Sequence, residues 1–125
     1  VEVLVSGGVI YPRVGVLVGP PAVEAFSKLH ADVAVMSAGG ITLEGITNSH
    51  GLLIDIQLAM LQAAQKVIFC FDHTKLGRKS VLPLCPLDRV DIIVTDSAAP
   101  TDLVQALRAQ SLEVVVAPPA DGVVS

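Results

Sequence analysis

Short aliphatic runs alternate along the sequence with segments of helical character. Hydrophobic residues make up 52% of the chain, whereas aromatic residues make up 3%, so any core must be built from aliphatic side chains. Valine-rich runs without polar alternation are typical of strands that are buried on both faces, as in parallel sheets. We expect strands at about 1–6, 16–18, 32–37, 66–71, 80–84 (an edge or antiparallel strand), 91–95 and 113–117.

Three segments between these runs favour helices. Pro21 suits the first turn of the first helix. The range 52–65 contains neither Pro nor Gly and is rich in strong helix formers. Ser97 or Thr101 can cap a third helix that ends near Ala109. This alternation predicts right-handed βαβ units, and therefore a doubly wound α/β fold whose mostly parallel sheet is flanked by helices.

The length and the net charge predict a single domain that does not itself bind nucleic acid. The chain has 125 residues and a net charge of −4, without a long basic stripe. We expect a domain over 1–117, a flexible tail over 118–125, and a longer parent protein, because a strand is predicted almost from Val1. No signal peptide or long apolar span is visible, so we expect a cytoplasmic protein that does not bind membranes.

The cysteines and histidines do not suggest a metal or redox site. Cys70 lies within the apolar run 67–71 and is expected to be a buried free thiol. Two cysteines, Cys70 and Cys85, fit neither a zinc site nor a disulfide framework. His73 has no partners at metal-ligand spacing, so we predict neither a metal nor a cofactor.

The turn over 72–79 is the first candidate ligand-binding segment. In open α/β sheets, ligands bind beyond the carboxyl ends of the strands. Lys75, Arg78 and Lys79 follow such a strand and create a local positive field suited to phosphate or carboxylate. Asp72 can accept hydrogen bonds from sugar hydroxyls, or it can hold Lys75 in place. A solvated turn with an incidental ion pair remains the alternative.

Two glycine-rich segments also follow strands, one at Gly7-Gly8 and one in a long loop over 39–49. Glycine lets backbone N–H groups approach an anion closely, although the same dipeptide is common in plain turns. Nearby hydroxyls and Glu44 can bind a sugar, or Glu44 can simply face water. The candidate site residues are Gly7, Gly8, Ser37, Gly39, Gly40, Thr42, Glu44, Asp72, Lys75 and Arg78.

Three motifs occur in a characteristic order: Gly-Gly after a strand, then Ser-Ala-Gly-Gly-Ile-Thr-Leu-Glu-Gly over 37–45, then Phe-Asp-His-Thr-Lys-Leu-Gly-Arg over 71–78. Over about 3–117 their order and spacing resemble the C-terminal effector-sensing domain of DeoR-family transcriptional repressors. The resemblance implies a Rossmann-like domain similar to the ribose-5-phosphate isomerase and CoA transferase-like fold. It implies a phosphorylated sugar or related metabolite as ligand, and a homodimer or homotetramer. DNA is implied as a partner only through an N-terminal winged helix-turn-helix.

Carried over onto this chain, the family's sensor motifs fall on Gly7 and Gly8, on Gly39, Gly40 and Glu44, and on Asp72 and Lys75. The family pattern also includes a first strand with an Asp-x-Gly-Thr-Thr-type loop, and we expect this chain to lack both. A Glu and a Lys often stand early in the family's long helix. The corresponding positions here look like Leu53 or Asp55, and Gln57.

Two other functions fit a chain of this fold. A sugar-phosphate isomerase needs a carboxylate as general base, and the range 35–40 contains none before Glu44, which predicts that the chain is not an enzyme. An oligomerisation module with a degenerate pocket is the third possibility.

Overall fold

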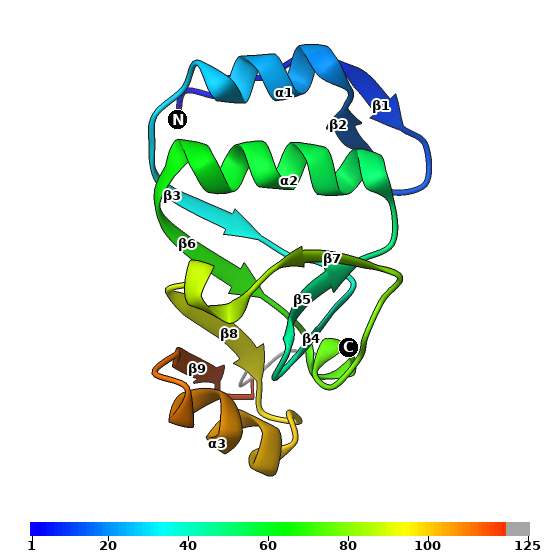
Figure 1. Cartoon of the computed structure of the whole chain (residues 1–125). Helices are drawn as coiled ribbons and strands as arrows, with labels where there is room; N and C mark the ends of the chain where they lie inside the picture. The colour runs from blue at the N-terminus through cyan, green and yellow to red at the C-terminus, as the bar shows by residue number, and fades with distance from the viewer. Residues whose placement is uncertain (120–125) are drawn as a thin grey trace.

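A four-stranded parallel sheet forms the centre of the molecule (Figure 1). The computed structural model describes residues 1–119. The strands lie in the order β3-β6-β8-β9, and the predicted mixed α/β fold with a parallel sheet flanked by helices is confirmed. Their bounds are Ala31–Met36 for β3, Ala64–Cys70 for β6, Ile92–Asp96 for β8 and Glu113–Ala117 for β9.

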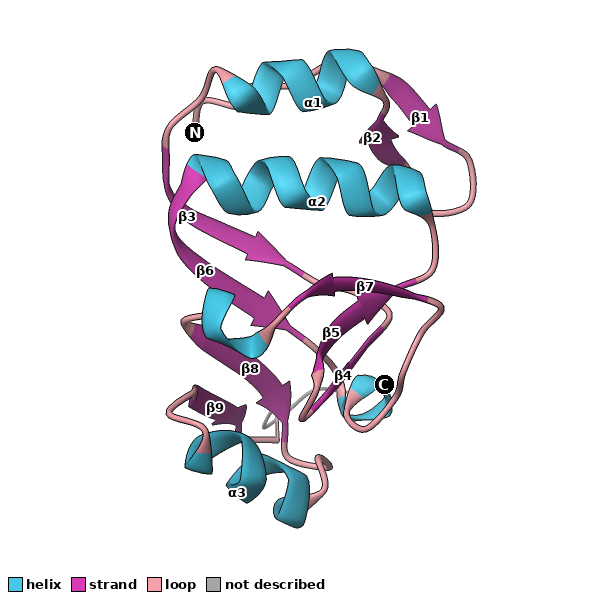
Figure 2. Ribbon diagram, in the orientation of Figure 1, coloured by secondary structure: helices cyan, strands magenta, loops and turns pink. Residues whose placement is uncertain are grey.

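The connections between these strands all pack on one face of the sheet. The strand order advances in one direction, so right-handed crossovers place every connection on the same side. Two of these connections contain the helices α2 (Gly51–Ala63) and α3 (Thr101–Ala109), which lie on that side of the sheet in Figure 2. The core between the layers is centred on Phe69, Ile93 and Leu107, each 0% exposed.

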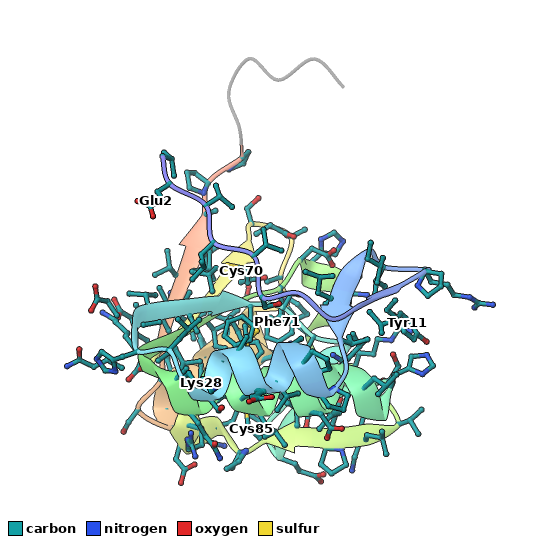
Figure 3. The ribbon with its side chains drawn as sticks, turned by 90° about the horizontal axis from the view of Figure 1, so that it is seen from above. Glu2, Tyr11, Lys28, Cys70, Phe71 and Cys85 are labelled. Carbon is teal, nitrogen blue, oxygen red and sulfur yellow. The ribbon has the colours of Figure 1, made fainter. Side chains whose placement is uncertain are left out.

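The opposite face of the sheet is open in the part of the chain that the structure describes. Val33 and Val35 of β3 are 45% and 62% exposed. In β6, Phe69 points into the core and the next residue, Cys70, points outward and is exposed, so the prediction that Cys70 is buried was wrong. Figure 3 shows Cys70 on the far side from the helices, whereas Cys85 is the buried thiol. The strands were predicted to be buried on both faces of a doubly wound sheet. Within the described residues helices cover one face only, so the doubly wound arrangement was wrong.

A second, antiparallel sheet replaces the long loop predicted over 39–49. Its strands are β4 (Gly40–Thr42), β5 (Gly45–Asn48) and β7 (Leu82–Cys85), in that order. Strands this short are stabilised mainly by pairing, and β5 pairs with β7 from far along the chain. The expectation of an antiparallel strand near 80–84 is confirmed by β7.

The N-terminal residues form a separate hairpin and helix. β1 (Val9–Tyr11) pairs with β2 (Val16–Val18), and α1 (Pro20–Ser27) follows. α1 packs on α2 through a small apolar cluster of Val18, Ala22 and Ile56 (Figure 1).

Three predictions about the chain ends and the third helix have different outcomes. The strand predicted over 1–6 is absent: these residues pair with no strand of the part of the chain that the structure describes, and Val3 is 78% exposed. Pro100, rather than Ser97 or Thr101, is the N-cap residue of α3. Most of the predicted tail, 120–125, lies outside the described residues. Within 1–119, no helix has both the length and the apolar character needed to cross a bilayer.

Candidate functional site

The loops that follow β3, β6 and β8 leave the parallel sheet at the same edge, where α/β folds place their ligands. They carry most of the predicted site residues. Two short 3₁₀ helices, η1 (His73–Lys75) and η2 (Leu87–Arg89), lie in the connection between β6 and β8.

The segment after β3 is packed tightly against the turn after β6. A Cβ at Gly40 would overlap the carbonyl group of Arg78, and a Cβ at Gly39 would lie 3.0 Å from the Cβ of Ser80. The N–H of Gly77 donates to the carbonyl of Ile41 at 2.8 Å. These glycines permit close approach, but the groups that approach them belong to the protein itself: the backbone carbonyl of Arg78 at Gly40 and the side chain of Ser80 at Gly39.

Asp72 organises the turn after β6 rather than reaching away from it. Its Oδ1 accepts a hydrogen bond from the N–H of Thr74 at 2.8 Å and another from the Thr74 hydroxyl. The hydroxyl bond, followed by the backbone bond, lowers the pKa of the Asp72 carboxyl, and the charge of Lys75 adds a smaller effect. Asp72 thus caps η1, and Lys75, the third residue of η1, is partly buried.

His73 and Asp96 link the turn after β6 to the loop after β8. The N–H of His73 donates to Asp96 Oδ2 at 2.8 Å, and His73 Nδ1 lies 3.0 Å from the same oxygen. Asp96 also accepts from the N–H of Ala98 at 2.8 Å. The bonds from His73 are the main cause of the lowered pKa of the Asp96 carboxyl. The role of Asp96 was missed from the sequence, although a carboxylate at the end of the strand beside Asp72 was the available signal.

Glu44 and Lys79 form an exposed ion pair. Lys79 Nζ donates to Glu44 Oε2 at 2.8 Å, which lowers the pKa of Glu44 and raises that of Lys79. The pair lies with Thr42 on the rim of a cavity of about 540 Å³ between the β4–β5 hairpin and β7. Glu44 therefore pairs with Lys79, and its side chain is also 77% exposed, as in the predicted alternative in which it faces water.

A second cavity, of about 380 Å³, opens at the carboxyl end of β3. Its polar lining comes from Ser37, Asn48 and Gln57. Asn48 Nδ2 donates to Gln57 Oε1 at 2.7 Å, and Gln57 Nε2 donates to the carbonyl of Ser37 at 2.6 Å. Asn48 and Gln57 are 8% and 9% exposed. Ser37 was among the predicted site residues, whereas neither amide was.

The first diglycine does not join these segments. A Cβ at Gly8 would lie 2.6 Å from the carbonyl oxygen of Val18 and 3.0 Å from the Cβ of Ala22. Gly8 therefore packs between β2 and α1, and Gly7 precedes it in the exposed N-terminal segment. The structure brings 39–48 and 72–80 together, and it leaves Gly7 and Gly8 with the N-terminal hairpin.

Comparison with known protein families identifies one that covers most of the chain. A family model described as the DeoR C terminal sensor domain matches residues 1–97, which extend from the N-terminus to just beyond β8.

Several curated transcription regulators are similar to the chain. The HTH-type transcriptional repressor GlcR of Bacillus subtilis is 32% identical over 96 residues, covering 77% of this chain and 37% of that protein. The HTH-type transcriptional regulator GolR of Listeria innocua is 25% identical, covering 94% of this chain and 46% of its own length. A putative aga operon transcriptional repressor of Escherichia coli O157:H7 is 26% identical, covering 93% and 44%. The chain thus spans less than half the length of each of these relatives.

Proposed function

The chain belongs to the family of DeoR C-terminal sensor domains, and on that basis we propose that it binds a phosphorylated sugar or a related metabolite and so controls DNA binding by a helix-turn-helix domain of the same regulator. The names of the relatives support a regulatory role, since two of the three are repressors and two are described as HTH-type. The proposal also holds that the chain is not an enzyme.

The observation that carries this proposal is the contact between the cationic turn and the β4–β5 hairpin at the ligand edge of the sheet. Lys75 and Arg78 lie within a turn whose backbone meets Gly40 and Ile41. A phosphate drawn to these cations would therefore act on a turn that is hydrogen-bonded to the hairpin. Lys79 contributes less positive field, because Glu44 neutralises it.

A regulator of this kind works by a shift between two conformations. An effector changes the equilibrium only if it binds one conformation more tightly than the other. The turn and the hairpin form a coupled unit, because the backbone of Arg78 meets Gly40 and the N–H of Gly77 donates to Ile41. We propose that effector binding changes the position of this unit, and that the rest of the regulator responds to the change.

Titration of the chain with sugar phosphates tests the proposal. Ribose 5-phosphate, glucose 6-phosphate and fructose 1-phosphate are compared by thermal shift and calorimetry. We expect at least one of them to bind, and we expect Lys75→Ala to weaken its binding at least tenfold without changing the melting temperature. Lys66→Ala is the matched control, because Lys66 is an exposed lysine at the other end of β6. Unchanged affinity in Lys75→Ala would refute the role of this lysine.

A coupled isomerase assay with the same compounds tests for catalysis. We expect no turnover, because a general base works best with a pKa near the operating pH, and pairing with Lys79 moves the pKa of Glu44 further below it. Sugar-phosphate turnover that is lost in Glu44→Gln would overturn the assignment as a sensor.

A further inference from the structure

The described residues that line the cavity at the carboxyl end of β3 are all uncharged. The cavity volume of about 380 Å³ lies within the range of small-molecule sites. Apart from Ser37, Asn48 and Gln57, its walls consist of aliphatic side chains and methionine. Among residues 1–119, no lysine, arginine, aspartate or glutamate lines it, and the cations of the 72–79 turn are not among its lining residues.

The two amides in this cavity have one possible orientation. Gln57 Nε2 faces the carbonyl oxygen of Ser37, which can only accept a hydrogen bond. Asn48 Oδ1 accepts from the N–H of Ser49 at 2.9 Å, and that group can only donate. The remaining bond, from Asn48 to Gln57, is consistent with both constraints. The series of hydrogen bonds that runs from Ser49 through Asn48 and Gln57 to Ser37 therefore ends at a backbone group on both sides.

This arrangement leaves hydrogen-bonding groups for a ligand. Each side-chain amide has two N–H groups and uses one of them within the chain of bonds. The Ser37 hydroxyl is also available, because Ser37 takes part through its backbone carbonyl. Asn48 and Gln57 are more than nine-tenths buried and line the cavity. Neutral donors and acceptors of this kind complement hydroxyl groups, and the apolar walls complement the C–H face of a sugar or polyol.

A phosphate group is poorly suited to the same space. Burying an ionised group without a partner of opposite charge is strongly unfavourable, and no described residue that lines the cavity is such a partner. The cation cluster of the turn over 72–79 belongs to a segment that contacts the hairpin at Gly40 and Ile41. The cationic turn therefore suits an anionic group, whereas the cavity suits an uncharged one.

We propose that this cavity binds the hydroxyl-bearing, uncharged part of the effector, a sugar or polyol, and that Ser37, Asn48 and Gln57 determine its specificity. The proposal rests on the function proposed above, and adds which part of the ligand is recognised and by which residues.

Calorimetric titrations of the full chain with ribose, glucose and sorbitol, with ribose 5-phosphate and glucose 6-phosphate, and with inorganic phosphate test the proposal. Ser37→Ala removes the hydroxyl and keeps the backbone carbonyl that holds Gln57. We expect it to weaken binding of the sugars and sugar phosphates about five- to tenfold, the effect of one lost hydrogen bond, and to leave inorganic phosphate unaffected.

Gln57→Lys tests the role of charge, because it places a cation in a cavity whose lining is uncharged. We expect it to weaken sugar binding and to strengthen binding of inorganic phosphate at least tenfold. Gln62→Lys is the control, since Gln62 is an exposed residue of the same helix and does not line this cavity.

The outcomes separate this inference from the proposed function. Sugar phosphates that bind the wild type and are insensitive to Ser37→Ala and Gln57→Lys would leave the sensor intact and overturn the cavity inference. Neutral sugars that bind with dependence on Ser37, and gain nothing from a phosphate, would support the cavity and refute a phosphorylated effector. Failure of every sugar and sugar phosphate to bind would overturn both.

Discussion

The loop after β3 and the turn after β6 leave the same edge of the sheet, yet different interactions hold them in place. At the end of β3, Asn48 and Gln57 are buried, uncharged and bonded to each other and to the backbone. At the end of β6, Asp72 and His73 are exposed and bond through charged or titratable groups. Removing a hydrogen-bond partner in the first region leaves a buried polar group unpaired and lowers the stability of the fold. The second region is open to water, so its interactions are weaker and depend on charge and pH.

The largest effect is expected at Gly40, where the two regions meet. Gly40→Ala places a Cβ against the carbonyl of Arg78, so the turn or the hairpin must move. Overpacking against rigid backbone predicts a loss of about 2–3 kcal/mol in the free energy of unfolding, measured by urea denaturation. Gly51→Ala is the control, because a Cβ there meets nothing within 4 Å. A Gly40→Ala variant as stable as this control would show that the two segments do not pack as described.

A smaller loss is expected when one buried amide is removed. Asn48→Ala leaves Gln57 Oε1 without its donor in a buried position, which predicts destabilisation by about 1–3 kcal/mol. The double variant Asn48→Ala, Gln57→Leu removes both partners and should lose less than the sum of the single changes. Strict additivity in this double-mutant cycle would mean that the two amides do not interact.

The smallest effect, and the one that depends on pH, is expected from the exposed carboxylates. Hydrogen bonds lower the pKa of both Asp72 and Asp96 below the ordinary value of 3.8. Their contribution to stability is therefore complete above the unfolded carboxyl pKa and is lost as the pH falls through the lowered folded values. Asp96→Asn should reduce the difference in melting temperature between pH 6 and pH 3. An unchanged difference would argue against the bond from His73 to Asp96.

The sequence predicted the regular elements well where local pattern determines them. The strand expected over 113–117 is β9, the one over 16–18 is β2, and α2 lies within two residues of the predicted helix. The β4–β5 hairpin was missed because it depends on pairing with β7, more than thirty residues later. The strand predicted over 1–6 was wrong because its local apolar pattern is not matched by a pairing strand among residues 1–119.

The candidate site was predictable only in part, for a similar reason. The charges of the 72–79 turn are local in sequence, so the turn could be identified as a candidate. The capping role of Asp72 depends on backbone geometry that composition does not reveal. The hydrogen bonds between the amides and to Ser37 join residues that are 9 and 20 positions apart. In the sequence, Asn48 does not stand out, and Gln57 stands out only as a replacement of the family's Lys. Their significance follows from burial and from the neutral cavity beside them.

The side-chain amide signals of Asn48 and Gln57 in nuclear magnetic resonance spectra provide the most direct test of the central claim, that the neutral cavity binds the uncharged part of the effector. The ¹⁵N-labelled chain is titrated with ribose 5-phosphate and glucose 6-phosphate, with inorganic phosphate as the reference. We predict that both amide pairs shift with the sugar phosphate that binds and stay in place with phosphate alone. Binding that shifts only the backbone signals of residues 72–79, and leaves both side-chain amides unchanged, would contradict the account.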